Sequence, residues 1–225
     1  MNKILLKKIT IISLLAAFGL IVGLSILVRF HPVLRFDVAL SHDLQAEGDS
    51  SLHKTLLFQI LSFVSIIGRT TVGAWVVLVC AALFFILKNY RETIYCLLTP
   101  LAVIISSMFK IIINRPRPDQ SLVYVLDHQL SPSYPSGHVV FFTVFFGYLI
   151  ATMFFVKKIP LWLRISVGII SSILIILISL SRIYLGAHWL TDVIAGYLFG
   201  IIYLSVLLYF YIRDYLDKEE KIRNS

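Results

Sequence analysis

Charged side chains are scarce in this chain. Only 14% of its 225 residues are Asp, Glu, Lys or Arg, whereas 59% are hydrophobic and the mean hydropathy is +0.90. A soluble globular domain typically carries about 25% charged residues, because its surface must face water. The shortage argues against a soluble domain and indicates that much of the molecular surface faces lipid.

Cysteine is almost absent, with two residues, Cys80 and Cys96. Both lie within apolar stretches, and neither belongs to a C-x-x-C pair or has a histidine beside it. This pattern argues against a disulfide framework or a cysteine metal site, and we expect both residues to pack as small apolar side chains.

Acidic residues are also few, with 12 Asp and Glu against 20 Lys and Arg, which gives a formal net charge of +8. The basic residues fall between apolar stretches and form no basic stripe, so a nucleic acid is not an expected partner. Their placement is typical of membrane orientation signals and of attraction to anionic lipid headgroups.

Long apolar stretches, in contrast, are abundant. Six of them cover residues 9–28, 70–87, 93–109, 139–156, 165–181 and 193–212. Each has about 17–20 residues, the length that a helix needs to cross a bilayer, and backbone groups in lipid must bond within their own helix. We therefore predict an all-α, integral membrane bundle of six transmembrane helices. Residues 1–225 form a single membrane domain in this prediction, with a short charged cytoplasmic tail at 213–225.

A seventh apolar stretch, residues 55–68, is shorter and more polar. It contains Gln59, Ser62 and Ser65 and is followed at once by Arg69. We interpret it as an interfacial or re-entrant helix that leads into the second span, with a longer, tilted second span as the alternative.

Six spans place both termini on the same side of the membrane. With cytoplasmic termini, the inner segments hold 12 of the 20 Lys and Arg residues and the outer segments hold 8. The positive-inside rule therefore favours cytoplasmic termini. Basic residues that remain on the unfavoured outer side indicate a functional site there.

Three short motifs carry the candidate chemistry. The first runs from Lys110 through Asn-Arg-Pro-Arg to Pro118, the second is Pro-Ser-Gly-His at 135–138, and the third occupies residues 181–192. In the predicted topology the first follows the third span, the second opens the fourth, and the third connects the fifth to the sixth. All three therefore lie at the outer face and can converge on one site.

These motifs contain the components of an anion pocket. Lys110, Arg117 and Arg182 supply cationic donors, and arginine forks match pairs of phosphate oxygens. Ser136 is placed to cap the helix that follows, and Gly137 allows backbone N–H groups to approach a ligand at a helix N-terminus. Together they predict a pocket for a tetrahedral, multiply charged anion.

Two histidines are placed for phosphoryl transfer. His188 and Asp192 are four residues apart, so they share one face if the sixth helix begins near His188. A carboxylate bonded to one ring nitrogen fixes the tautomer and leaves the other nitrogen free to attack phosphorus. His138, from another segment, can protonate the leaving alkoxide.

The three motifs together resemble the signature of the type 2 phosphatidic acid phosphatase family, which shares its core with the vanadium-dependent haloperoxidases. That signature is Lys, six residues, Arg-Pro; then Pro-Ser-Gly-His; then Ser-Arg, five residues, His, three residues, Asp. All the defined residues of this signature are present in this sequence with the required spacing, from Lys110 to Asp192. Six spans with an outward site also resemble the bacterial membrane members.

The resemblance implies a metal-independent lipid phosphatase that needs no cofactor. The residues that it assigns to phosphate binding are Lys110, Arg117, Ser136, Gly137 and Arg182. It implies that His188 forms a phosphohistidine, that Asp192 orients His188, and that His138 is the general acid. The expected partners are the bilayer and a lipid substrate, namely undecaprenyl pyrophosphate, phosphatidylglycerol phosphate or phosphatidic acid, and a monomer would suffice.

Three alternative functions use the same pocket: a lipid headgroup carrier, a lipid-linked phosphotransferase, and a haloperoxidase with bound vanadate. Outside the matched positions, we interpret Arg115 as a contact to the lipid headgroup, and Asp127 and His128 as solvated loop residues. Gly196 and Gly200 have the small-residue spacing of close helix packing within the chain.

Overall fold

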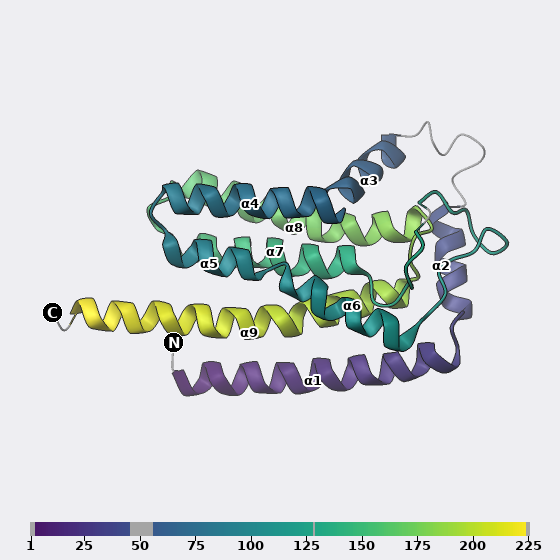
Figure 1. Ribbon diagram of the computed structural model, residues 1–225, viewed down its shortest axis with the longest axis horizontal. Helices are drawn as coiled ribbons and strands as arrows, with labels where there is room; N and C mark the ends of the chain where they lie inside the picture. The colour runs from purple at the N-terminus through teal and green to yellow at the C-terminus, as the bar shows by residue number, and fades with distance from the viewer. Residues whose placement is uncertain (1–2, 46–55, 128, 224–225) are drawn as a thin grey trace.

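A computed structural model describes residues 3–45, 56–127 and 129–223. Within these ranges the chain is helical and contains no strand, which confirms the all-α prediction (Figure 1). The helices are α1 (Lys3–Phe30), α2 (Arg35–Gln45), α3 (Leu56–Ile67), α4 (Thr70–Ile86), α5 (Tyr90–Leu98), α6 (Leu101–Ile113), α7 (Gly137–Phe155), α8 (Leu161–Tyr184) and α9 (Leu190–Arg223). Of the residues discussed above, Thr55, His128 and residues 224–225 of the tail lie outside the described residues.

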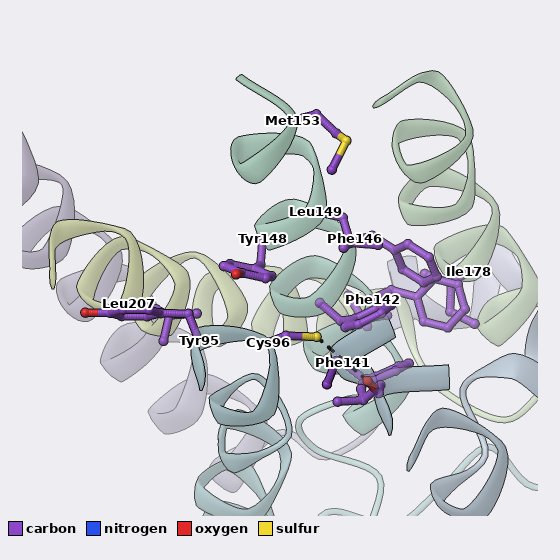
Figure 2. Packing of buried hydrophobic residues seen from close by; sticks show 14 of the residues in the cluster. Tyr95, Cys96, Phe141, Phe142, Phe146, Tyr148, Leu149, Met153, Ile178 and Leu207 are labelled. Carbon is purple, nitrogen blue, oxygen red and sulfur yellow. Dashed lines mark hydrogen bonds between the residues drawn. The ribbon is translucent and has the colours of Figure 1, made fainter. Parts of the chain in front are cut away.

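Helix α7 forms the centre of the bundle. In its most apolar stretch 67% of the residues are buried, against 11% to 28% in the other single spans. Its phenylalanines pack with neighbouring helices around a core that includes Phe142, Phe146, Tyr148 and Ile178 (Figure 2). The other spans leave apolar side chains exposed, as expected for helices whose outer faces contact lipid.

The number of membrane-crossing elements is close to the prediction. Among the described residues, five helices or helix pairs are long and apolar enough to cross a membrane, and α3 with α4 makes a sixth if this bent pair counts as one span. The predicted third span consists of α5 and α6 in succession, which together cover Tyr90–Ile113.

The short apolar stretch forms a helix of its own. α3 joins α4 with a bend of 68° at residues 68–69. The bent pair fits either a re-entrant helix that leads into the second span or one longer second span that is broken at the bend, and these are the two predicted alternatives.

Close packing of α9 against α7 helps to position the three motifs. A Cβ atom on Gly196 would lie 2.8 Å from the Cβ of Val139, and one on Gly200 would lie 2.6 Å from the Cβ of Thr143. The glycines of α9 thus let it approach α7 closely, as the small-residue spacing predicts. The end of α6, the start of α7 and the α8–α9 connection gather at one end of the bundle, opposite the end near which both termini lie (Figure 1).

Candidate active site

A cavity of about 550 Å³ opens at the end of the bundle where the three motifs meet. Five of the eight predicted site residues line it: Lys110, Arg117, Gly137, His138 and His188. The other three, Ser136, Arg182 and Asp192, do not line the cavity and are fully buried. The convergence arises because α6 ends, α7 begins and α8 turns into α9 at this same place.

The end of α6 determines where Arg117 lies. Asn114 closes the helix in the left-handed conformation, with φ of 47°, and its N–H donates to the carbonyl of Lys110 at 2.9 Å. Pro116 and Pro118 follow and cannot continue the helix, because proline has no N–H to donate. The chain therefore leaves the helix extended and carries Arg117 back over the cavity.

His188 and Arg117 are in direct contact. Nη1 of Arg117 lies 3.1 Å from Nε2 of His188 and also donates to the carbonyl of Ala187 at 2.6 Å. A guanidinium can only donate, so Nε2 must be the accepting nitrogen and the ring proton sits on Nδ1. The unprotonated Nε2 of His188 is thus the nitrogen that faces the cavity cations.

The surroundings of His188 keep its ring neutral. Burial, followed by the positive charges of Arg117, Lys110 and Arg182, holds the pKa of His188 well below its usual value of 6.5. Burial also lowers the pKa of Arg117 to about 10, which leaves that guanidinium protonated at neutral pH. A neutral imidazole beside fixed positive charges combines a nucleophile with a binding site for an anion.

Asp192 lies behind His188 and is held by several donors. Its Oδ2 accepts from the Trp189 N–H at 2.9 Å and from the Ser133 hydroxyl, while Oδ1 accepts from Arg115 at 2.6 Å. Nδ1 of His188 is 3.5 Å from Oδ2, a long separation for a hydrogen bond. Helix α9 begins at Leu190, two residues after His188, so the pair meets at the helix start instead of along a helix face.

The interpretation of Arg115 as a headgroup contact is wrong. This residue is 1% exposed and makes buried ion pairs with Asp192 and with Asp37 of α2, the latter at 2.7 Å. Asp37 also accepts from the N–H of Thr191 at 3.0 Å. Sequence reasoning missed Asp37 altogether, and the signal for it was an acidic residue with no assigned partner in a segment predicted to lie at the outer face.

His138 faces the cavity from the first turn of α7. Its Nε2 is buried and has no hydrogen-bond partner among the residues that the structure describes. Gly68, at the α3–α4 bend, lies against the ring, since a Cβ on Gly68 would be 2.3 Å from Cδ2 of His138. His138 therefore has a nitrogen that is free to exchange a proton with a ligand.

The start of α7 differs in one respect from the prediction. Ser136 makes no side-chain cap, and its Oγ is buried without a partner in the described part of the chain. Its N–H donates instead to the carbonyl of Asp192 at 3.0 Å, which ties α7 to α9. Lys110 reaches over the same region and donates to the carbonyl of Pro132 at 2.9 Å.

Arg182 is buried behind the cavity and already has partners. Nη1 donates to Oδ2 of Asp127 at 2.9 Å, and Nη2 donates to the hydroxyl of Ser65. The prediction that Asp127 is simply solvated is therefore wrong, because it neutralises Arg182. The Nε of Arg182 has no partner within the described ranges and is the one nitrogen of this guanidinium without a hydrogen bond.

Comparisons with known proteins identify the family to which the chain belongs. Residues 91–215 match the PAP2 superfamily. The chain is 30% identical over 150 residues to phosphatidylglycerophosphatase B of Bacillus subtilis, and this match covers 66% of this chain and 69% of the relative. It is 33% identical over 154 residues to an undecaprenyl-diphosphatase of Sulfolobus acidocaldarius, and this match covers 65% of this chain and 68% of the relative.

A solved structure has the same fold. The transmembrane PAP2-type phosphatidylglycerolphosphate phosphatase of Bacillus subtilis superposes with a TM-score of 0.74 at 23% identity, over 88% of this chain and 95% of that one. The fold, the family match and the identity to curated relatives lead to one conclusion: the chain belongs to the PAP2 superfamily and is a multi-pass membrane protein of the phosphatase class.

Proposed function

We propose that this protein removes the terminal phosphate from a lipid phosphate or lipid pyrophosphate through a phosphohistidine on His188. One observation carries the proposal: the unprotonated Nε2 of a neutral His188 lies 3.1 Å from the Arg117 guanidinium, in a cavity that Lys110 also lines. A phosphoryl group held by these cations would be adjacent to the nucleophilic nitrogen.

The reaction proceeds in two steps. Nε2 of His188 forms a bond to phosphorus while the bond from phosphorus to the leaving oxygen breaks, and His138 donates a proton to that oxygen. Asp192 stabilises the positive charge that then develops on the His188 ring. His138 next takes a proton from water, the water oxygen attacks phosphorus, and the P–N bond breaks to release inorganic phosphate.

The positive charges of the cavity assist both steps. Lys110 and Arg117 lie where charge accumulates on the phosphoryl oxygens in the transition state. In the structure both side chains donate to backbone carbonyls of residues 131–133. With a phosphate bound, Lys110 and Arg117 would donate to its oxygens instead, in stronger, charge-assisted hydrogen bonds. No metal ion is needed for this stabilisation.

The rest of the cavity suits a lipid. Its other lining residues include apolar side chains of α4, α6 and α7, among them Ala74, Ile104, Ile111 and Phe141. Ile104 and Ile111 are 61% and 79% exposed, so the apolar part of the cavity continues onto the surface that faces the membrane. A lipid tail can remain in the bilayer while its headgroup enters between α4 and α6.

The site faces the outside of the cell membrane and both termini are cytoplasmic in this proposal. The distribution of Lys and Arg favours this orientation, with 12 on the inner segments and 8 on the outer ones. The termini lie near one end of the bundle and the motifs at the other (Figure 1).

Phosphate release by the purified protein tests the proposal. Undecaprenyl pyrophosphate, phosphatidylglycerol phosphate and phosphatidic acid should be compared side by side, since relatives with the first two activities are similar to this chain. We expect His188→Ala to abolish release while the protein still inserts and folds, and acid-labile phosphate to accumulate on the wild-type chain alone.

The same assay separates the alternatives. A lipid carrier would bind the headgroup and release no phosphate, and a phosphotransferase would label an added acceptor lipid in place of water. Halide oxidation in the presence of vanadate would identify a haloperoxidase. Release by His188→Ala at the wild-type rate would overturn the mechanism.

A further inference from the structure

Ser133 lies between the two residues on which the proposed nucleophile depends, His188 and Asp192. Its hydroxyl donates to Oδ2 of Asp192 and is 3.4 Å from Nδ1 of His188. The residue belongs to the loop between α6 and α7, is fully buried and does not line the cavity. It precedes the Pro-Ser-Gly-His motif and is not among the defined residues of the signature. Its side chain can therefore influence the reaction only through these neighbours.

Oδ2 of Asp192 already has two donors. It accepts from the Ser133 hydroxyl and from the N–H of Trp189 at 2.9 Å, while Oδ1 accepts from Arg115 at 2.6 Å. Nδ1 of His188 is 3.5 Å from Oδ2, beyond the usual range of about 2.7–3.2 Å for such a bond. The Ser133 oxygen is as near to Nδ1 and is itself bonded to Asp192, so it provides a second connection between the carboxylate and the ring.

The direction of these hydrogen bonds determines which nitrogen of His188 carries the proton. A carboxylate that is ion-paired with an arginine can only accept, so the single hydroxyl proton of Ser133 points to Asp192. The lone pairs of the Ser133 oxygen then face Nδ1 and require a proton on that nitrogen. Arg117 requires the same tautomer from the opposite edge of the ring, because it donates to Nε2.

The backbone of Ser133 is held on several sides. Its N–H donates to the carbonyl of Arg115 at 2.9 Å, and its carbonyl accepts from Nζ of Lys110 at 3.5 Å. Burial and the cavity cations lower the pKa of His188, and a hydrogen bond between the ring and the Ser133 backbone opposes them. The loop is thus attached to the buried ion pair, to a cavity cation and to the ring, which fixes where the Ser133 hydroxyl can point.

We propose that Ser133 is a positioning residue: its hydroxyl carries the effect of Asp192 to Nδ1 of His188 and thereby keeps Nε2 unprotonated. The inference rests on the proposed function of His188. When Nε2 bonds to phosphorus, the ring becomes positively charged and keeps its Nδ1 proton. That proton donates to the Ser133 oxygen, whose own proton donates to Asp192, so the charge is stabilised without a proton transfer. Catalytic hydrogen bonds are often long without substrate and shorten in the transition state.

Ser133→Ala tests the role of the hydroxyl directly. We expect kcat for phosphate release to fall about 10-fold or more, the size expected for a hydrogen bond to a charged group. KM should change little, because Ser133 does not line the cavity. The assay uses the full chain in detergent with whichever of the three candidate lipids the wild type hydrolyses fastest. A loss that appears in KM and leaves kcat unchanged would contradict a positioning role.

Ser106→Ala is the matched control. Ser106 is a fully buried serine of α6 whose hydroxyl donates to the carbonyl of Val103 at 2.9 Å, and it does not line the cavity. We expect this variant to keep the kcat of the wild type. Equal losses of kcat in both variants would show that removing a buried hydroxyl is enough to slow the enzyme, and the inference would fail.

A double-mutant cycle tests whether Ser133 acts through Asp192. In Asp192→Asn the amide can donate to the Ser133 oxygen, which frees the hydroxyl proton to turn toward Nδ1 and favours the wrong tautomer. We therefore expect Ser133→Ala combined with Asp192→Asn to be no slower than Asp192→Asn alone. Losses that multiply in the double variant would mean that the two residues act independently, and the inference would be wrong.

Orthovanadate provides a measurement that needs no turnover, because it can bond to Nε2 as a phosphoryl group does. We expect its Kd, measured by titration calorimetry, to rise about 10-fold in Ser133→Ala and to stay unchanged in Ser106→Ala. An unchanged Kd together with the wild-type kcat in Ser133→Ala would overturn the inference and leave the proposed function intact. If the wild type releases no phosphate from any of the three lipids, the proposed function fails first and the role of Ser133 fails with it.

Discussion

The guanidinium of Arg115 donates to Oδ1 of Asp192 at 2.6 Å, and neither side chain has any exposed surface. On its other side Arg115 binds Asp37 at 2.7 Å, so one buried arginine joins α2 to the start of α9. Burial keeps solvent away from these charges, so they must be compensated by one another and by the hydrogen bonds around them. The orientation of Asp192 behind His188 thus depends on a residue, Asp37, that lies 78 positions from Arg115 in the chain.

We expect Asp37→Asn to lower both stability and turnover. The substitution leaves Arg115 with one counterion fewer in a site that solvent does not reach, and breaking a buried ion pair costs about 3–5 kcal/mol. Because Asp37 does not line the cavity, kcat should fall with little change in KM. Thermal unfolding in detergent and the kinetics of phosphate release measure the two effects.

Asp119→Asn is the control for this substitution. Asp119 is an exposed acidic residue of the loop between α6 and α7, where its carboxylate accepts from the N–H of Ser121. We expect this variant to behave like the wild type. If Asp37→Asn matched Asp119→Asn in melting temperature and kcat, the buried network would have no role in positioning Asp192.

The pH dependence of activity should reflect the lowered pKa of His188. A lowered pKa means that the ring stays neutral, and hence nucleophilic, as the pH falls through 6.5, so protonation of His188 should reduce kcat/KM only below that pH. Arg117→Gln removes one of the charges that lower this pKa. It should therefore move the acid limb of the profile to higher pH, in addition to slowing the reaction.

Arg35→Gln changes an exposed arginine of α2 that does not line the cavity, so it should leave the acid limb where it is in the wild type. A profile for Arg117→Gln with an unshifted acid limb would show that some other group governs activity at low pH.

We expect full activity in excess chelator. Lys110 and Arg117 supply the positive charge that a metal ion provides in many other phosphatases. Phosphate release after EDTA treatment, with and without added Mg²⁺, is the measurement. Loss of activity in EDTA that Mg²⁺ restores would contradict the proposed mechanism.

Gly186→Ala should destabilise the turn that precedes His188. Gly186 has φ of +62°, and a Cβ would lie 2.1 Å from the carbonyl oxygen of Tyr124, a backbone atom that cannot move away easily. The left-handed conformation alone costs a residue with a side chain about 1–2 kcal/mol, and the clash adds to it. Thermal unfolding of the purified variant should show a lower midpoint, and activity should fall with it.

Gly168→Ala provides the comparison. Gly168 lies in α8, and a Cβ there would meet nothing within 4 Å. Alanine favours a helix over glycine by about 1 kcal/mol, so this variant should be as stable as the wild type or more so. A Gly186→Ala variant as stable as Gly168→Ala would mean that the turn relaxes without cost.

The spans were predictable because helices in lipid depend on local features. Apolar length and the need to satisfy backbone groups within one segment are readable along the chain, and the predicted stretch 70–87 differs from α4 by one residue at its end. The bend of 68° between α3 and α4 was not predictable to that degree, since it depends on how Gly68 fits against His138.

The sequence predicted five of the residues that line the cavity, but it did not predict the contacts around them. Motif spacing and the predicted topology placed Lys110, Arg117, Gly137, His138 and His188 at the same end of the helix bundle. The structure places all five around one cavity. The partners of Arg115 and Arg182 were missed. A buried charge can pair with any acidic residue that folding brings near it, and spacing along the chain does not indicate which one.

The sequence by itself determined that this is a helical membrane protein of the PAP2 type, because apolar length and motif spacing are local properties. Tertiary structure alone decided that Asp37 supports Asp192 through Arg115, and that Asp127 pairs with Arg182 behind the cavity. Both facts depend on the packing of α2, α8 and α9 around α7, where buried charges must find partners among residues far apart in the chain.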